Sequence, residues 1–459
     1  MAADIVLRGG RIVDPASGRD EVGDLLLRDG AVAAVGGAVA APAGATVLDA
    51  AGLVVTPGWI DLHAHLREPG FTYKETIAGG ARAAAQGGYT TVCCMPNTDP
   101  PLDSPAAIRA VLDRARDAAV RVLPIATITQ GRRGLEPVDY IALAEAGAIG
   151  FSDDGDSTKS AAAMRAALEA SRVVGCPVMV HCEDPDLVRG GAMNEGAVSR
   201  ALDLPGSPGV AEDVILARDL TLTAATGGWL YACHVTTAHS AQLLREAKAR
   251  GVRVTGEATP HHLALTDEWV AGERRTHWER DAEAPRGAPA DPNTKVNPPL
   301  RTGADVEALV AALRDGTLDT IGTDHAPHAA RDKPADDYRA AAFGMLAFEV
   351  ALPTLLTLVR AGALDLNTII AKLTIAPARV LGGVLPRGAG TLAVGAPADV
   401  TVFDPATRWA VTPDALASTS KNTPLLGLTV QGRVAWTIVG GEMRYESGSR
   451  AVGQSGSGS

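Results

Sequence analysis

Aromatic residues and cysteines are scarce in this chain of 459 residues. Phe, Trp and Tyr make up 4% of it, and five cysteines are present, at positions 93, 94, 176, 182 and 233. An odd, low number of cysteines excludes the paired disulfide framework of a small secreted protein. Because the cysteines lie in or beside apolar runs, we expect buried free thiols rather than metal ligands.

Basic clusters and long apolar segments are also missing. The formal net charge is −11 and no block is rich in Lys and Arg, which excludes the phosphate-neutralising surface of a nucleic-acid-binding protein. No segment runs 18 apolar residues, and the N-terminus MAADIVLRGGRIVDP lacks the pattern of a signal peptide. We therefore expect a soluble, cytoplasmic protein with neither nucleic acid nor membrane as a partner.

One unit recurs through the middle of the chain: a short apolar run, a turn and an Ala-rich segment. The eight runs are GWIDLHAH, TTVCCMP, RVLPIAT, AIGFSDD, PVMVHCE, LYACHVT, VRVTGEATP and DTIGTDHAP. Apolar residues at steps of three and four predict helices in segments such as SPAAIRAVLDRARDAA and HSAQLLREAKARG. Eight strand–helix units predict an α/β protein with a (β/α)8 TIM barrel as its catalytic domain, over residues 57–389.

The two ends of the chain have a different pattern. Residues 1–56 and 390–446 read as short alternating strands with turns, which predicts one small β-sandwich domain formed from both chain ends. Residues 447–459 are low in complexity and predict a flexible tail. The polar, aperiodic segment 271–293 predicts a long loop, which is either a solvated insertion or a mobile cover over a site.

Side chains that carry chemistry gather at the ends of the apolar runs, where the reactive groups of such barrels lie. Six of the ten histidines are there, together with three aspartates: His63, His65, His181, His234, His325, His328, Asp153, Asp154 and Asp324. A His-x-His pair alone is weak evidence for a metal site. Strand ends that supply further imidazoles and carboxylates make the accidental explanation improbable.

A metal centre explains this set of residues best. His63 and His65 project to one side of an extended strand, at a spacing that lets two imidazoles share a divalent ion. Asp154 is placed to bridge two ions, with Asp153 turned to the opposite side. Neutral imidazoles with carboxylates favour Zn²⁺, although Mn²⁺, Co²⁺ or Fe²⁺ suit the same ligands. Such a pair of ions implies hydrolysis, with Asp324 as ligand and base; a helix N-cap is the structural alternative for Asp324.

The ordered motifs resemble a known family. They are GWIDLHAHLREPG, CMPNTDPP, GFSDDG, VHCED, ACHVTT, EATPHHLALTD, KVNPPLR, GTDHAPH and FGMLAFEVALP, along nearly the whole chain. The chain resembles the bacterial, single-chain (type I) dihydroorotases of the amidohydrolase superfamily. This resemblance implies reversible ring closure of N-carbamoyl-L-aspartate to L-dihydroorotate, a step of pyrimidine (UMP) biosynthesis.

The resemblance also implies roles for individual residues. His63 and His65 match ligands of a first zinc ion, His181 and His234 match ligands of a second, and Asp154, with a hydroxide, bridges the two ions in each subunit. Asp324 matches the catalytic acid and base, which is also a metal ligand. Many members of the superfamily have a carboxylated lysine at the bridge, whereas this chain has an aspartate, as the type I branch does.

Substrate binding needs a cation near the metals, because carbamoyl aspartate carries two carboxylates. Arg67, two residues after the His-x-His pair, fits this need, and a surface salt bridge is its structural alternative. The expected substrate-binding residues are His65, Arg67, Asn97, Asn297 and His328. The resemblance further implies that Phe343 and Gly344 contact the pyrimidine ring through backbone groups. His261 and His262 belong to the family pattern and are candidates for contacts behind the metal ligands, but they could equally orient a neighbouring loop. We expect His239 and His277 to be solvated.

Two other functions compete with this interpretation. Some dihydroorotase-like chains have lost their ligands and serve as scaffolds for aspartate carbamoyltransferase, but all expected ligands are present here. Cyclic amidases of hydantoin or allantoin usually keep the bridging lysine and lack the arginine. The small-molecule substrate is thus the predicted partner, while a homodimer and a complex with aspartate carbamoyltransferase stay open.

Overall fold

The centre of the molecule is a closed ring of parallel strands. The computed structural model describes residues 4–279 and 286–448. The ring contains β6 (Trp59–Ala64), β7 (Tyr89–Cys94), β8 (Arg121–Pro124), β9 (Val178–Val180), β12 (Leu230–Ala232), β13 (Val254–Ala258) and β14 (Thr320–Ile321). Phe151 fills the place between β8 and β9 through single bridges to Ala126 and Val178, and a bridge between Ala64 and His325 closes the ring. The predicted barrel is confirmed, although its fourth run forms bridges rather than a strand.

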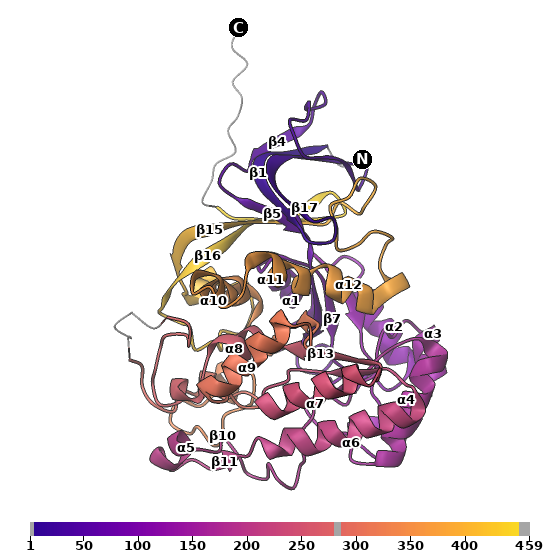
Figure 1. Cartoon of the computed structure of the whole chain (residues 1–459), viewed down its shortest axis with the longest axis vertical. Helices are drawn as coiled ribbons and strands as arrows, with labels where there is room; N and C mark the ends of the chain where they lie inside the picture. Colours follow the sequence, from indigo (N-terminus) through magenta and orange to yellow (C-terminus); the bar gives the residue numbers. More distant parts are fainter. Residues whose placement is uncertain (1–3, 280–285, 449–459) are drawn as a thin grey trace.

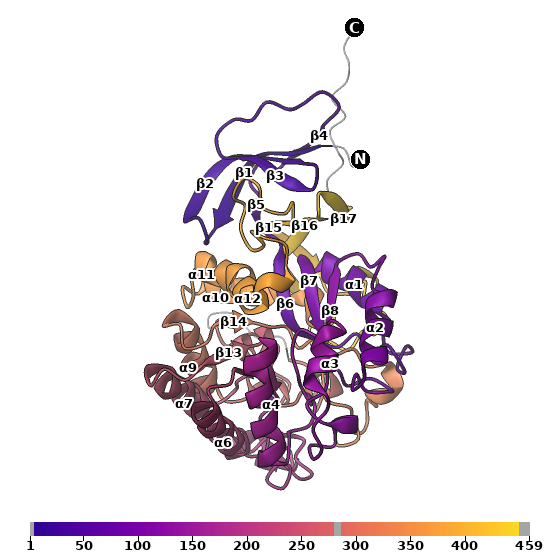
Figure 2. The same cartoon turned by 90° about the vertical axis from the view of Figure 1, so that its right-hand side faces the viewer.

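Helices surround this ring on the outside, as Figures 1 and 2 show. They are α1 (Ile77–Gln86), α2 (Pro105–Arg114), α3 (Tyr140–Glu145), α4 (Ala161–Val174), α5 (Ala197–Ala201), α6 (Val210–Thr226), α7 (Ala238–Ala249), α8 (Pro260–Ala264), α9 (Gly303–Arg314), α10 (Phe348–Arg360), α11 (Leu366–Leu373) and α12 (Ile375–Leu381). The helices α1, α2, α4 and α7 each begin at a Ser or Thr whose side chain accepts a backbone N–H of the first turn. These caps fix where each helix starts after its strand.

The barrel interior is filled by apolar side chains from the strands. Ile60, Leu62, Met179 and Tyr231 belong to one buried cluster, which also includes residues of α12. Interior side chains of adjacent strands therefore pack against one another, and α12 covers one end of the ring. Two short strands, β10 (Met193–Asn194) and β11 (Gly206–Ser207), pair with each other in the long connection between β9 and α6.

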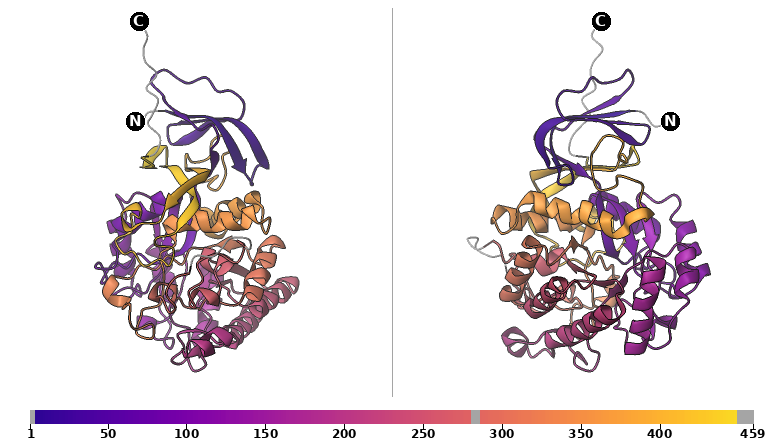
Figure 3. Two further views of the ribbon diagram at one scale, coloured as in Figure 1. Left: turned by 90° about the vertical axis from the view of Figure 1, so that its left-hand side faces the viewer. Right: turned by 45° about the vertical axis from the view of Figure 1, so that its right-hand side comes forward.

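Strands from both chain ends pair in one mixed sheet, which lies to one side of the barrel (Figure 3). It contains β1 (Ile5–Asp14), β2 (Arg19–Arg28), β3 (Ala31–Val35), β4 (Thr46–Asp49), β5 (Val54–Pro57), β15 (Val400–Ala410), β16 (Thr429–Val439) and β17 (Glu442–Glu446). The strand order is β17-β16-β15-β5-β1-β2-β3, with β4 paired to β1. Both ends contribute to a common apolar cluster, so the predicted pairing of the ends is confirmed.

This end sheet is joined to the beginnings of the first barrel strands. Gly58 N donates to Asp399 O at 2.8 Å, and the guanidinium of Arg121, at the start of β8, donates to the Asp399 carboxylate. Thr401 Oγ1 donates to Gly88 O just before β7. The end sheet thus holds the amino ends of the strands and leaves their carboxyl ends accessible. The predicted domain boundaries stay predictions, and most of the predicted tail lies outside the described residues.

The predicted loop at 271–293 has irregular structure over its described part, with one isolated bridge between Glu273 and Arg286. Residues 280–285 lie outside the described residues, so its part in covering a site stays open. Within 4–279 and 286–448, each helix is too short or too polar to span a bilayer.

Candidate metal centre and active site

Six side chains from the carboxyl ends of the ring converge on one point. They form the His/Asp cluster: His63, His65, Asp154, His181, His234 and Asp324. All six are buried, with exposed fractions between 0% and 7%. His63 and Asp324 are far apart in the sequence. The bridge between Ala64 and His325, which closes the ring, brings them together.

Asp154 lies at the centre of the His/Asp cluster. Its Oδ1 is 3.4 Å from His63 Nε2 and 3.6 Å from His234 Nε2, and its Oδ2 is 3.4 Å from His65 Nε2. His181 Nδ1 lies 3.9 Å from Oδ1. Asp153 points elsewhere, as predicted, because its carboxylate accepts the backbone N–H groups of Ile128 and Thr129. One carboxylate therefore faces four imidazoles.

The cluster has the composition and spacing of a metal centre. In three sets of residues, all the donor atoms lie within 4.8 Å of one another: His63, His65 and Asp154; His63, His234 and Asp324; and Asp154, His181 and His234. His63 Nε2 and Asp154 Oδ1 are buried and have no hydrogen-bond partner among the described residues. Since buried polar atoms are nearly always satisfied, these two atoms fit metal ions as their missing partners.

Hydrogen bonds on the far side of the imidazoles orient the ligand nitrogens. Glu257 Oε1 is 2.9 Å from His63 Nδ1, Asn97 Oδ1 is 2.8 Å from His65 Nδ1, and Glu183 Oε2 is 3.0 Å from His181 Nε2. An oxygen acceptor on one ring nitrogen places the proton there and leaves the other nitrogen free to bind a metal. Each of the three rings therefore turns its other nitrogen toward Asp154 at the centre of the cluster.

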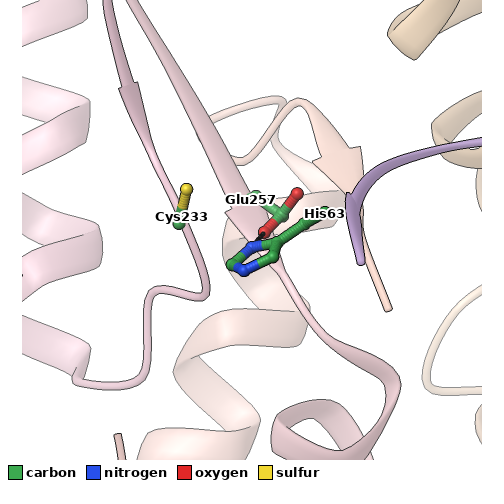
Figure 4. A group of neighbouring side chains, drawn as sticks. All are labelled: His63, Cys233 and Glu257. Atoms are coloured by element: carbon green, nitrogen blue, oxygen red, sulfur yellow. Dashed lines mark hydrogen bonds and ion pairs between the residues drawn. The ribbon is translucent and has the colours of Figure 1, made fainter. Parts of the chain in front are cut away.

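Glu257 and Cys233 are buried neighbours of His63, and the Glu257 carboxylate lies against the imidazole (Figure 4). Tyr231 donates its hydroxyl to Glu257 Oε2 at 2.6 Å, so both carboxylate oxygens of Glu257 are engaged. The donor atoms of His63, Cys233 and Glu257 also lie within 4.8 Å of one another. Burial raises the pKa of Cys233 to about 12, so that its thiol is protonated at neutral pH. This agrees with the expectation of a buried free thiol.

Charge within the cluster favours ionised carboxylates. Burial alone would raise the pKa values of Asp154 and Asp324, but the surrounding imidazoles, His63 foremost, outweigh it and hold both pKa values below their ordinary range. Asp324 Oδ1 lies 2.9 Å from His65 Nε2 and 3.6 Å from His63 Nε2. Asp324 has a φ of 46° and caps no helix in the structure, so the alternative of an N-cap is excluded.

A cavity of about 250 Å³ opens onto the cluster. Every predicted substrate-binding residue lines it: His65, Arg67, Asn97, Asn297, His328, Phe343 and Gly344. Arg67 is 8% exposed, and burial lowers its pKa to about 10, which leaves it charged at neutral pH. Its Nε donates to Pro327 O at 3.1 Å, which fixes the guanidinium beside His328. The site therefore combines a metal-binding cluster with a buried cation.

Two loops hold His328 and the backbone of Phe343 and Gly344 in place. Lys74 Nζ lies 3.2 Å from His328 Nδ1, and His328 Nε2 lies 2.7 Å from Phe343 O. Gly344 N already donates to Lys295 O. His328 therefore lines the cavity and also contacts the loop that carries Phe343.

Three residues of the site do not follow from the sequence pattern. Glu257 lies inside the run VRVTGEATP rather than at its end, and an acidic residue within a buried strand is the one signal that points to it. Arg132 lines the cavity from the loop after β8, and no spacing rule points to it. Glu183, within the quoted motif VHCED, also contacts a ligand histidine.

The remaining histidines have different surroundings. His261 and His262 are buried on α8 outside the cavity lining, and His262 Nε2 contacts Pro298 O at 3.0 Å. This contact ties α8 to the loop that carries Asn297, in agreement with an orienting role. His239 is exposed, as predicted. The solvated interpretation of His277 is wrong, because its ring is half-buried and pairs with Glu307.

Comparison with known proteins identifies the family of this chain. The model of the Amidohydrolase family matches residues 54–444. A dihydroorotase of Geobacter sp. (strain M21) is 45% identical over 97% of this chain and 100% of its own length, and one of Anaeromyxobacter dehalogenans (strain 2CP-1) is 48% identical over 97% and 99%. The chain belongs to the dihydroorotases of the amidohydrolase family.

Solved structures of this family share the fold. The L-hydantoinase (dihydropyrimidinase) of Arthrobacter aurescens has a TM-score of 0.81 at 24% identity and covers 98% of both chains. A D-hydantoinase structure has a TM-score of 0.79 at 27% identity, with 97% of this chain and 96% of that chain covered. The fold of this chain is therefore shared with solved structures of hydantoinases.

Proposed function

We propose that this chain is a metal-dependent cyclic amidohydrolase that interconverts N-carbamoyl-L-aspartate and L-dihydroorotate, a step of pyrimidine biosynthesis. The observation that carries the proposal is the convergence of the His/Asp cluster beside a buried arginine within one cavity. The cluster supplies the ligands of an amide hydrolase, and the arginine supplies the counter-charge that an acidic substrate needs. The relatives named dihydroorotase support the same reaction.

The metal ions are proposed to be two zinc ions in each subunit. His63 and His65 would hold one, His181 and His234 the other, and Asp154 would contact both, with Asp324 as a further ligand. Imidazole nitrogen with carboxylate oxygen is a donor set that suits zinc. When bound, such ions polarise a carbonyl group and make a nucleophile available near neutral pH.

Asp324 is proposed to move the proton. In the hydrolytic direction its carboxylate accepts a proton from the water that attacks the amide carbonyl, and it then delivers that proton to the ring nitrogen as the C–N bond breaks. In the direction of ring closure the same group takes the proton from the carbamoyl nitrogen. Its carboxylate lies 2.9 Å from His65 Nε2 and lines the cavity, so it faces the space in which the reacting nitrogen would lie.

Arg67 is proposed to hold the carboxylate that stays free during the reaction. It is a buried, charged and fixed donor, and Asn97, Asn297 and His328 add further polar contacts around the same cavity. Charge-assisted hydrogen bonds of this kind orient the substrate as well as bind it. Phe343 and Gly344 complete the wall against which the ring lies.

A comparison of substrates tests this function. Turnover is measured with L-dihydroorotate, N-carbamoyl-L-aspartate and hydantoin on one preparation whose metal content is determined by atomic emission. We expect turnover of the first two, little turnover of hydantoin, and one to two equivalents of zinc. Turnover of hydantoin alone would instead favour a hydantoinase, and a chain that binds metal without any turnover would favour a scaffold.

The finer statements about assembly also stay proposals. A homodimer and a complex with aspartate carbamoyltransferase follow from the family resemblance. Light scattering of the purified chain, alone and mixed with that transferase, measures both.

A further inference from the structure

One connection of the end sheet reaches the loops that frame the cavity. Residues 411–428 join β15 to β16, and within them Ser418, Ser420 and Asn422 are buried, with exposed fractions of 0%, 5% and 4%. Polar side chains in a connection between strands are usually exposed to solvent. Hydrogen bonds to the barrel satisfy these three side chains. The connection is therefore built into the barrel rather than lying on its surface.

Asn422 makes the hydrogen bonds nearest to the cavity. Its Oδ1 accepts the backbone N–H of His328 at 2.9 Å, and its Nδ2 donates to the backbone oxygens of Ala326 at 3.0 Å and Gly344 at 3.1 Å. Its own backbone oxygen accepts the N–H of Leu346 at 3.0 Å. One residue from the connection between β15 and β16 therefore binds both the segment after β14 and the segment that carries Gly344.

The partners of Asn422 determine the orientation of its amide group. A backbone N–H can only donate and a backbone carbonyl can only accept, so the amide oxygen must face His328 and the amide nitrogen must face the two carbonyl groups. Asparagine offers these acceptor and donor groups in one plane, whereas aspartate has the same shape but no donor when ionised. The set of three contacts is therefore specific to an amide side chain.

The two segments that Asn422 connects are closely packed at the cavity wall. Ala326 N donates to Met345 O at 2.9 Å. A Cβ built on Gly344, whose φ is 128°, would lie 2.6 Å from Ala326 Cβ and 3.2 Å from His328 Cδ2. Ala326, His328 and Gly344 line the cavity, whereas Asn422 is buried outside the lining. The contacts of Asn422 therefore set the relative position of two parts of the wall.

The same connection also reaches His328 by a second route. Ser420 Oγ donates to Lys74 O at 2.7 Å, and Lys74 Nζ lies 3.2 Å from His328 Nδ1. The imidazole of His328 is thus held by Lys74, and its backbone is held by Asn422. Both sets of contacts depend on the connection between β15 and β16.

We propose that Asn422 is a positioning residue for substrate binding, which holds His328 and the backbone of Gly344 at the spacing that the substrate ring requires. This inference rests on the proposed function, in which His328 and Gly344 contact the substrate. It gives the connection between β15 and β16 a part in substrate binding, although the end sheet itself contacts the opposite ends of the barrel strands. Asn422 acts through other residues and takes no part in metal binding or proton transfer.

The test compares Asn422→Ala with Ser418→Ala. Ser418 is a matched control, since it is buried in the same connection but donates to Glu349 of α10 rather than to a residue of the cavity. We expect Asn422→Ala to raise KM for dihydroorotate by roughly 10-fold, because a shift of about 1 Å in a positioned group can cost up to about 100-fold. Zinc content should not change, and kcat should stay within about threefold, as for a contact made equally in ground and transition states. Ser418→Ala should lower the thermal midpoint but leave KM unchanged.

A double-mutant cycle with His328→Ala separates positioning from general destabilisation. If Asn422 acts through His328, the addition of Asn422→Ala to His328→Ala should raise KM by no more than about threefold, because the positioned contact is already lost. A purely structural role would instead raise KM by the same factor in both backgrounds. Asn422→Ser, which keeps a hydroxyl group, makes the same comparison with a smaller loss of contacts, and its KM should lie between those of the parent and Asn422→Ala.

Three results would overturn the inference. They are an unchanged KM in Asn422→Ala and Asn422→Ser, an equal rise of KM in Ser418→Ala, and the same factor with and without His328. Calorimetric titration with dihydroorotate measures the dissociation constant of each variant without turnover. A parent chain that binds dihydroorotate without converting it would count against the proposed function alone. A parent chain that converts it, with the same affinity in Asn422→Ala, would count against the positioning role alone.

Discussion

Asp324 is the residue on which the proposed chemistry depends most directly. It has a strained backbone, touches His65 and lines the cavity where a substrate would lie. These properties suit a group that must hold one orientation while it exchanges a proton with the reacting nitrogen. In the proposed reaction its carboxylate is both a metal ligand and a base, so removal of its charge would affect both roles.

We predict that Asp324→Asn lowers kcat for dihydroorotate at least about a hundredfold, because an amide cannot accept the proton. Zinc content is measured on the same sample so that loss of metal is separated from loss of the base. Asp336→Asn, an exposed carboxylate on a nearby loop, is the control and should keep full activity. Substantial kcat in a fully metal-loaded Asp324→Asn sample would contradict the assignment.

The loops that frame the cavity contain a buried lysine whose charge opposes folding. Lys333 is 8% exposed and donates to Pro292 O and Lys295 O at 3.0 and 3.1 Å. Burial, together with the nearby charge of Lys295, lowers the pKa of Lys333 from its usual 10.5 to about 7. The ammonium thus connects the segment after β14 to the segment that carries Asn297. Burial of its positive charge opposes this contribution to stability.

Stability should depend on pH through this residue. Between about pH 7 and 10.5 the unfolded chain holds the Lys333 proton and the folded chain does not, so the free energy of unfolding rises with pH in this window. The contribution is at most about 1.4 kcal/mol per pH unit. Denaturant unfolding of Lys333→Met at pH 7, 8 and 9 should lack this rise, whereas the exposed control Lys159→Met should retain it. Equal slopes in parent and Lys333→Met would refute the shift.

At the scale of elements, the sequence predicts the barrel and the convergence of its His and Asp side chains, because both depend on local pattern. The roles of these side chains as metal ligands stay predictions. Apolar runs of strand length identify the ring, and His or Asp at their last positions must meet once the ring closes. This pattern does not predict Arg132 or Glu257. The place of Arg132 depends on how the loop after β8 folds over Gly155, and Glu257 is visible only once its contact with His63 is known. The fourth apolar run also differs from its prediction as a strand: among the described residues it pairs with its neighbours through the single bridges of Phe151.

At the scale of the whole molecule, Asp399 connects the end sheet to the barrel. Its carboxylate accepts from Arg121 of β8 and from the backbone N–H of Gly440, while its own carbonyl accepts from Gly58. One residue therefore connects three segments that are distant in sequence. Because the ion pair is largely shielded from water, its loss also leaves Arg121 without a counter-charge.

We predict that Asp399→Ala lowers the free energy of unfolding by about 2 kcal/mol, as expected for a buried group that accepts several hydrogen bonds. The thermal midpoint should fall accordingly, while kcat at 25 °C stays near that of the parent because the end sheet lies away from the cluster. Asp414→Ala, an exposed residue between β15 and β16, is the control and should leave the midpoint unchanged. An unaltered midpoint in Asp399→Ala would show that the sheet and the barrel are held together elsewhere.

The closure of the ring between Ala64 and His325 also sets an order of events during synthesis. His65 and Asp324 are neighbours in space but 259 residues apart in the chain. At translation speeds of about 5 to 20 residues per second, roughly 10 to 50 s pass between the emergence of the two. A growing polypeptide on the ribosome therefore exposes its first histidine pair long before the rest of the His/Asp cluster exists, and only late in synthesis could the full cluster hold a metal ion.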